Sequence, residues 1–542
     1  MKKKYLEKFL LYILASLIFY FAFLPIFSVL IYGIDTFLKE GDFFGLIKRP
    51  LLHLKNSLSI AIIVTILSTT LGFILSFTLN RIEFKGRKLL KKLAFLPLIN
   101  PPFVGSIAFI MLFGRRGLIS HRLLNLSISP FGPHGIIIIE VLSFSALAYL
   151  IISSAIRKVD VSLENAARNL GTSEFKIFYT ITLPLMIPEI SSAALLVFLA
   201  SMADFTTPLI IGGAFQTLAS DLYIQITGLY DLPSAAFSGI ILLIPCILAF
   251  IVQRYYLQPR SFFSDTIKEH AIEYKQISPK AKFFFISITT LFLSFILFKY
   301  LFIVLGAFTK QWGYNYTFTL EHVKTVFSSR YFKPFINSIQ LSITVAFISS
   351  LAGVLLAYLL SRKENLFNTV LDFLGILPAA VPGILFGIGY LITFRYPLFY
   401  YSSITLLGTG IIIYIISIFR YLNVGLRSGY ALIKHINPDL EKAAYNLGSS
   451  PLKTTVTIIL PLLKEAFNSA FYKNFSTTMT TLGAIIFLLL PSNKVAVQQI
   501  FQTITSSAIG VAATMSLLLS LLTLILLLLF HFILDTAATE RR

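Results

Sequence analysis

The chain has 542 residues, of which 56% are hydrophobic and only 13% are charged, whereas soluble proteins carry about 25% charged residues. Apolar runs long enough to cross a bilayer recur along the sequence, so the composition excludes an ordinary soluble protein. Such continuous runs also argue against the alternating strands of a membrane β-barrel. The net charge is +21. In a membrane protein this excess is explained by Lys and Arg residues in the cytoplasmic loops, so we expect no nucleic-acid partner.

The sequence contains few Cys and His residues that could serve metal binding or redox chemistry. The single cysteine, Cys246, lies in an apolar run and can form no disulfide within the chain. The seven histidines are scattered without the spacing of metal ligands. We therefore expect no metal site, no cofactor and no catalytic residues, and a membrane-embedded enzyme is the least favoured class.

Twelve membrane-spanning helices are predicted, which defines an all-α polytopic membrane fold. The first follows the basic start MKKK, and its apolar stretch is too long for a cleaved signal peptide, so we expect it to be retained. The predicted spans are residues 9–33, 57–80, 93–113, 135–157, 188–212, 236–257, 283–306, 338–360, 371–394, 403–422, 464–490 and 510–534.

Basic stretches predict the orientation of these spans. Residues 1–4, 81–92 and 253–282 are rich in Lys and Arg and fall on one side of the arrangement. Positively charged loops stay in the cytoplasm, so both termini are predicted to be cytoplasmic in the cell (inner) membrane. The third stretch is the natural linker between a first half, residues 1–252, and a second half, residues 283–542.

The two halves repeat each other in sequence. Residues 56–81 match residues 337–362 at an offset of 281, and from the fourth span of each half onward the offset is 277. Each half holds six predicted spans, and an even number returns the chain to the same side. The halves are therefore predicted to be parallel repeats related by an axis along the membrane normal.

A polar loop is duplicated within this repeat. Residues 160–184 and 437–461 are identical at 13 of 25 positions. Both predict a short helix, a glycine turn and a second helix that returns to the membrane. An ordinary amphipathic helix at the membrane surface explains the polarity of such a loop, but it does not explain why the same residues recur at the same spacing.

The ends of the first short helix are marked by suitable residues in both copies. Asp160 and Asn437 are good N-caps. Gly171 and Gly448 stand where the helix should stop, in the left-handed C′ position that glycine adopts most easily. Both copies thus predict the same rigid cytoplasmic element.

This pattern resembles the EAA loop of the permease subunits of ABC importers, which reads E-A-A, three residues, G, and a spacer that ends in I-x-L-P. The resemblance implies a coupling helix that docks into a cleft on a separate ATPase subunit. The triplet glutamate of the family would fall at Asn165 and Lys442, because the glutamates of this chain lie one residue earlier. The expected coupling residues are Glu164, Ala166, Ala167, Gly171, Leu183, Pro184, Glu441, Ala443, Ala444, Gly448, Leu460 and Pro461, and Ile181 and Ile458 also match the pattern.

A chain with two such halves fused is similar to the ferric-iron permeases of this superfamily, and thiamine, phosphonate and sugar-phosphate permeases share that architecture. The resemblance implies three partners: an ABC ATPase dimer on the cytoplasmic face, an extracytoplasmic solute-binding protein and membrane lipid. No phosphate-binding G-x-x-x-x-G-K-[ST] loop occurs in the chain, so we expect ATP hydrolysis on the ATPase subunit and no enzyme activity here. Ferric iron is the first expected solute.

The translocation path is weakly marked, and other transport classes stay open. Asp204 is the most conspicuous acid in a predicted span, and such acids usually face a cavity or a partner. It is a candidate path residue, although hydrogen bonds to Thr206 or Thr207 would also explain it. An ion-gradient-driven secondary transporter with two six-span halves is the alternative class, and a channel is the third.

Overall fold

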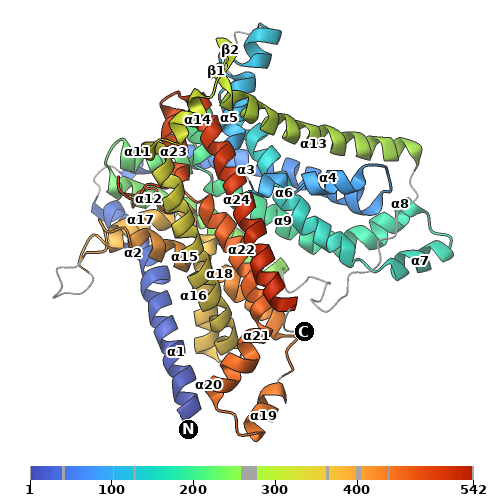
Figure 1. Cartoon of the computed structure of the whole chain (residues 1–542), viewed down its shortest axis with the longest axis vertical. Helices are drawn as coiled ribbons and strands as arrows, with labels where there is room; N and C mark the ends of the chain where they lie inside the picture. The colour runs from blue at the N-terminus through green and yellow to red at the C-terminus, as the bar shows by residue number, and fades with distance from the viewer. Residues whose placement is uncertain are drawn as a thin grey trace.

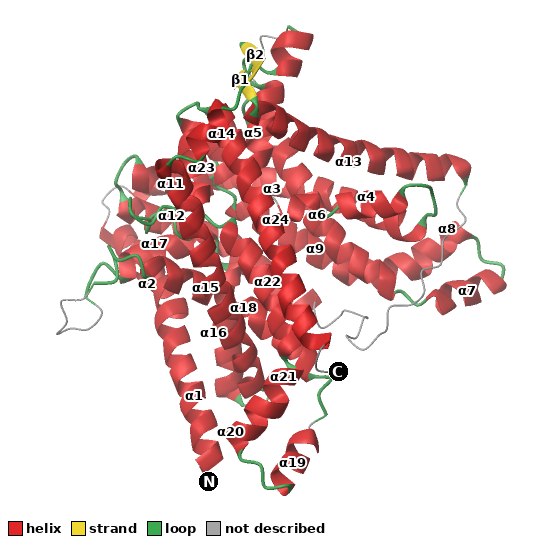
Figure 2. Ribbon diagram, in the orientation of Figure 1, coloured by secondary structure: helices red, strands yellow, loops and turns green. Residues whose placement is uncertain are grey.

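The computed structural model describes residues 2–39, 43–99, 101, 103–125, 130–257, 278–361, 365–397, 405–437 and 439–539. Helices make up almost all of this part of the chain (Figure 2). Its one sheet is an antiparallel hairpin of β1 (Thr309–Gln311) and β2 (Asn315–Phe318). The predicted helical class is therefore confirmed for the described residues.

Eight helices in the described ranges are long and apolar enough to cross a membrane, or nine if a bent pair counts as one span. The chain is thus a multi-pass membrane protein. The eight are Phe9–Lys39 (within α1, Lys2–Ile18, η1, Phe19–Phe23, and α2, Leu24–Lys39), Phe44–Arg81 (α3, Phe43–Arg81), Pro133–Lys158 (α6), Glu174–Ala203 (α8, Glu174–Ile177, η4, Phe178–Thr182, and α9, Leu183–Ala203), Leu232–Leu257 (α12, Leu232–Ile251, and η5, Val252–Leu257), Pro279–Ala307 (α13), Ser329–Leu360 (α15) and Ile509–Leu534 (within α24, Ile509–Thr539).

Shorter helices connect these spans. They are α4 (Arg87–Leu93), η2 (Leu96–Ile99), α5 (Val104–Phe113), η3 (Leu118–Leu123), α7 (Val161–Asn169), α10 (Thr206–Ile211), α11 (Leu218–Thr227), α14 (Glu321–Val326), α16 (Leu366–Ala380), α17 (Gly383–Thr393), α18 (Ile412–Ile433), α19 (Asp439–Asn446), α20 (Pro451–Thr454), η7 (Thr455–Ile459), α21 (Leu460–Leu462), α22 (Lys464–Met479) and α23 (Ala496–Thr505). Of the linker predicted at 253–282, residues 258–277 lie outside the described ranges.

The predicted span 93–113 is not one continuous helix. The chain is helical in α5, but the described residues between Leu93 and Val104 form no α-helix, and η2 is the only regular element among them. Pro97 and Pro101 lie in this stretch and have no backbone N–H to donate, and Phe103 has a left-handed φ of 79°. The proline pattern thus breaks the helix in the interior of the protein.

Two spans predicted in the second half have different bounds. Instead of 403–422, the structure has α18, which begins at Ile412. The helix predicted over 464–490 ends at Met479 in α22, and irregular chain follows. Apolar composition alone therefore placed these boundaries wrongly, since a buried irregular segment can be as apolar as a helix.

The pair α16 and α17 is bent by 111°. Pro382 disfavours a helical conformation of the residue before it, and Val381 is extended, with φ −88° and ψ 129°. The break frees backbone carbonyls that need donors. The guanidinium of Arg420 on α18 supplies them, since its Nη1 donates to Val381 O at 3.2 Å and to Pro378 O at 3.4 Å.

Equivalent helix pairs pack closely in both halves. Gly72 of α3 faces Ala148 of α6, and a Cβ added at Gly72 would lie 2.6 Å from the Ala148 Cβ. Gly353 of α15 faces Gly425 of α18, where an added Cβ would clash with the backbone. Small residues let membrane helices approach in this way, so the matching sequence segments make matching contacts.

A polar contact is also shared by the two halves. The Asn56 side chain at the start of the first repeat donates to Gln216 O at 2.9 Å. Its counterpart Asn337 donates to Lys494 O at 2.8 Å. Both amides tie a long helix to the loop before a short one, α11 or α23.

The halves join through a helix that proline distorts. Pro25 in α2 cannot donate to the carbonyl of Phe21, and the turn Phe19–Phe23 is π-helical. The hydroxyl of Tyr390 on α17 donates to that carbonyl at 2.6 Å. Gly389 packs on the Pro25 backbone so closely that any side chain there would clash.

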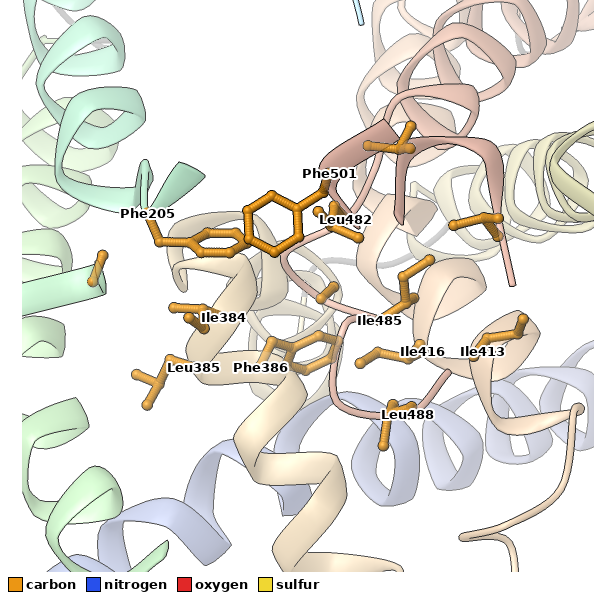
Figure 3. Packing of buried hydrophobic residues seen from close by; sticks show 14 of the residues in the cluster. Phe205, Ile384, Leu385, Phe386, Ile413, Ile416, Leu482, Ile485, Leu488 and Phe501 are labelled. Atoms are coloured by element: carbon orange, nitrogen blue, oxygen red, sulfur yellow. The ribbon is translucent and has the colours of Figure 1, made fainter. Parts of the chain in front are cut away.

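One hydrophobic core spans both halves. It includes Val29 and Phe205 of the first half and Phe386 and Phe501 of the second. Figure 3 shows Phe205 pointing toward Phe501 and Leu482, with α17 beside them. The two halves are thus packed as one body at this level.

The polar loops lie away from this core. Figure 1 shows α7 and α19 at two separate projecting ends of the molecule, with the N-terminus on the side of α19 and the β1–β2 hairpin at the opposite end. Outer helices such as α24 expose large apolar side chains, including Ile525, Leu528 and Phe532, which suits contact with membrane lipid.

Candidate coupling loops and path residues

The first loop folds as the cap residues predict. The Asp160 carboxylate accepts a hydrogen bond from Ser162 N at 2.8 Å and caps α7. Gly171 has a φ of 79°. Its N–H donates to Arg168 O at 2.9 Å, and Thr172 N donates to Ala167 O at 3.1 Å. These two bonds form the Schellman motif that ends a helix at a left-handed residue.

The second loop has the same construction. Asn437 accepts a hydrogen bond from Asp439 N at 2.9 Å. Gly448 also has a φ of 79°, with Gly448 N donating to Tyr445 O at 2.9 Å and Ser449 N donating to Ala444 O at 3.0 Å. The duplicated residues therefore specify duplicated backbone geometry, and this part of the prediction is confirmed.

Both loops expose matching apolar residues. Leu170 is 85% exposed and its counterpart Leu447 is 87% exposed. Ala166 and Ala443 are exposed as well. The two loops thus present the same combination of an exposed leucine and a small residue at corresponding places.

The glutamate of the first loop points inward. Glu164 is 1% exposed, and its carboxylate lies 3.3 Å from Arg81 Nη1 at the end of α3. It also accepts a hydrogen bond from Thr182 Oγ1 at 2.5 Å, and Arg81 donates to Ile156 O at 3.3 Å. Glu164 thus fastens α7 to its own half rather than reaching toward a partner.

The second loop keeps the buried glutamate but changes one of the residues around it. Glu441 is also buried, at 5% exposure, and accepts a hydrogen bond from Tyr445 Oη at 3.5 Å. Residue 362, which corresponds to Arg81, lies outside the described residues, and Ile459 stands where the first half has Thr182. Neither glutamate is thus placed to bridge to another subunit.

The exposed position next to that glutamate also differs. Lys442 is exposed, and its ammonium group donates to the Asp439 carboxylate at 2.8 Å, which raises the pKa of that ammonium group. Asn165 takes this place in the first loop and accepts a hydrogen bond from Arg168. These are the positions at which the EAA pattern has its glutamate, so the two loops present different polar groups there.

The chain returns from each loop through a π-helical turn, η4 or η7. Pro184 and Pro461 follow these turns and cannot donate to the carbonyl four residues earlier. The wider turn accommodates the missing bond, as such turns commonly do. Leu183–Pro184 and Leu460–Pro461 thus set how each loop re-enters the helical bundle.

Asp204 lies in a break of the predicted span 188–212. Helix α9 ends at Ala203 and α10 begins at Thr206. The carboxylate accepts hydrogen bonds from Thr206 N at 2.8 Å and Oγ1 at 2.7 Å, and from Thr207 N at 3.2 Å and Oγ1 at 2.6 Å. The threonine bonds expected as an alternative are therefore present, and the same residue also lines a cavity of about 380 Å³.

Comparison with protein families matches residues 68–262 to the model of the binding-protein-dependent transport system inner membrane component. The chain is 31% identical to the ferric transport system permease protein FbpB of Actinobacillus pleuropneumoniae, with 97% of this chain and 78% of that protein covered.

The chain belongs to this family of ABC importer permeases. The permease is also 32% identical to a putative ferric transport system permease protein, FbpB 1, of Haemophilus influenzae, with 88% of this chain and 77% of that protein covered. A shorter match, 33% identical over 31% of the chain, is to the molybdenum transport system permease protein ModB of Escherichia coli.

Three residues of the candidate sites were not predicted from the sequence. Arg81 and Thr182, which hold Glu164, are separated from it by 83 and 18 residues. Glu140, which is 1% exposed and lines the same cavity as Asp204, lies in an apolar run where it was overlooked. A lone acid inside a predicted span is the signal that could have found it.

Proposed function

We propose that this permease passes ferric iron across the inner membrane. The proposal rests on relatives named as ferric transport permeases that align over most of the chain. An extracytoplasmic binding protein would deliver the ion, and an ATPase dimer at the cytoplasmic face would supply the energy.

The duplicated loop geometry is the observation that supports this mechanism best. Helices α7 and α19 end in the same glycine motif and expose corresponding leucines. Each loop would seat in one subunit of the ATPase dimer. Closure of that dimer on ATP would draw the loops together and rock the halves around a path at their interface.

The membrane arrangement that we propose has twelve spans in two parallel six-span repeats, divided at 252 and 283, with both termini and both loops in the cytoplasm. The paired contacts of Asn56 and Asn337 support the repeat. The predicted spans 93–113, 371–394 and 464–490, which are not single continuous helices, would cross as broken spans inside the bundle. Helix α18 would cross as a continuous helix in place of 403–422.

The opposite face offers a place for the binding protein. A cavity of about 490 Å³ beside β1 is lined by Arg115, Arg116 and Lys310. These cations would meet acidic patches on the binding protein. Charge complementarity of this type mainly sets the rate and orientation of docking.

Reconstituted uptake tests the function. The permease, its ATPase and its binding protein would be placed in liposomes, and import of radiolabelled ferric iron measured with and without ATP. We expect ATP-dependent import that unlabelled ferric iron competes for and that thiamine and molybdate do not. ATP-dependent import of another solute would refute the substrate, and import by the permease alone on an ion gradient would refute the class.

A further inference from the structure

Most residues that line the cavity beside Asp204 belong to the first half, and one belongs to the second. Pro97, Pro101, Phe103, Ser106 and Glu140 contribute from the first half. Thr480 at the end of α22 contributes from the second. The cavity therefore lies at the interface around which the proposed rocking motion would take place.

Two carboxylates line this cavity, one from α6 and one from the break between α9 and α10. Glu140 on α6 accepts a hydrogen bond from Ser201 Oγ, and Asp204 is held by four donors from Thr206 and Thr207. Both acids lie within the bundle of apolar helices, where ionisable groups are costly and usually functional. Their hydrogen bonds thus hold both carboxylates at the same cavity.

A hydroxyl in the same cavity has no hydrogen-bond partner within the part of the chain that the structure describes. Ser106 on α5 is 1% exposed, lines the cavity, and makes no hydrogen bond to any residue in the described ranges. Buried polar groups are normally paired. An unpaired hydroxyl beside two carboxylates is suited to an oxygen-seeking ligand that enters the cavity.

The second half fills the corresponding place with a fixed cation. At the offset of 277, Ser143 in the cavity wall corresponds to Arg420. The Arg420 guanidinium lies against the carbonyls of Pro378 and Val381, and Pro378 corresponds to the cavity residue Pro97. A positive charge thus occupies the helix break in the second half.

The carboxylates are likewise confined to the first half. Glu140 corresponds to Ser417 and Asp204 to Thr481. The second half has the Arg420 guanidinium in this region, whereas the first half has a cavity lined by the carboxylates of Glu140 and Asp204. An oxyanion such as molybdate would be repelled by that pair, whereas a multiply charged cation would be attracted.

We propose that Glu140, Asp204 and Ser106 form a transit site for a multiply charged, oxygen-seeking metal cation. Hard cations prefer carboxylate, hydroxyl and water oxygens, and a cavity of about 380 Å³ leaves room for a partly hydrated ion. Identifying that cation as ferric iron rests on the proposed function.

The decisive variant is Glu140→Gln combined with Asp204→Asn, which removes both charges with little change in volume. Glu189→Gln, which removes an acid from α9 outside this cavity, is the control, and Glu140→Asp is the charge-conserving variant. Uptake of radiolabelled ferric iron and ATPase stimulation by the loaded binding protein are measured together in liposomes. Binding of Tb³⁺, a hard trivalent probe, to the full-length permease in detergent is measured by equilibrium dialysis.

We expect the double variant to lose at least tenfold in uptake and to bind one fewer Tb³⁺ per chain, while ATPase stimulation is retained. The control should match the wild type, and Glu140→Asp should keep the bound Tb³⁺. Unchanged Tb³⁺ binding in the double variant would overturn the site, whether or not uptake falls. If the wild type imports no ferric iron, the proposed function fails, and the Tb³⁺ comparison still decides the site.

Discussion

The two halves of the permease agree at their duplicated polar loops and differ within the helical bundle. At the loops, Gly171 and Gly448 have the same φ of 79° and the same hydrogen-bond pattern, and Leu170 and Leu447 are equally exposed. In the membrane, the first half has Glu140 and Asp204 at a cavity, whereas the second has Arg420 inserted in a helix break.

The two copies of the repeat are thus constrained differently at the loops and at the cavity. A surface that meets two identical partners must be kept in both copies, because each copy has the same task. A path that a single ion follows needs one set of ligands, so the second copy is free to change. The loops are thus two copies of one element, whereas both carboxylates of the cavity come from the first half.

The largest effect is expected at the glycine turns. Gly171→Val combined with Gly448→Val forces a β-branched residue into a left-handed conformation that L-residues disfavour by about 1–2 kcal/mol or more. An added Cβ meets nothing within 4 Å at either position, so the strain acts on the backbone alone. Misplacement of a coupling element can cost roughly 100-fold in rate, and we expect a loss of that order in ATP-dependent uptake.

The control for this pair is Gly408→Val. Gly408 has a φ of 90° and equally open surroundings, but it lies outside both loops. It should insert into the membrane and retain most of its uptake. Equal uptake by the double variant and this control would contradict a coupling role for the loops.

The next effect concerns the inward glutamate. Arg81→Ala leaves Glu164 buried without the guanidinium that lies 3.3 Å away, and breaking a buried ion pair costs about 3–5 kcal/mol. We expect a lower unfolding temperature and weaker binding of the ATPase. The double variant Arg81→Ala with Glu164→Leu should recover part of the stability, and a single variant as stable as the wild type would show that the pair does not hold α7.

The exposed leucines test the equality of the loops. Leu170→Ser and Leu447→Ser should each remove about 2 kcal/mol of apolar burial at the interface, which is roughly 30-fold in affinity for the ATPase. Leu229→Ser, at a 54% exposed leucine outside the loops, serves as the control. The affinity for the ATPase, measured in detergent, should fall equally for the two loop variants. A loss of affinity at only one loop would contradict an equal role for the two loops.

The smallest effect is expected at Arg420. Arg420→Met removes the donor to Val381 O and Pro378 O, and an unsatisfied buried acceptor costs about 1–3 kcal/mol. The unfolding temperature of Arg420→Met should be lower than that of the wild type. The unfolding temperature of Arg420→Lys should lie between these two. A variant of unchanged stability would mean that other groups satisfy these carbonyls.

Local elements were predicted best where a residue type determines the backbone conformation at its own position. Asp160, Gly171 and Gly448 fix helix ends through their own backbone bonds, so a short window is enough to predict them. The span at 93–113 failed because burial makes an irregular, proline-broken segment as apolar as a helix. Arg81 and Thr182 could not be assigned, since their roles arise from contacts that only the folded chain brings together. Glu140 could have been singled out as an acid inside a predicted span.

The central claim is that α7 and α19 each hold one ATPase subunit at the cytoplasmic face. Leu170→Cys and Leu447→Cys, introduced singly into a Cys246→Ala background, would be crosslinked to the ATPase in membrane vesicles. The account predicts that each cysteine captures an ATPase subunit, and that the pair together captures two per permease chain. Crosslinking from only one loop, or labelling of either cysteine by a membrane-impermeant reagent from the outer face, would contradict it.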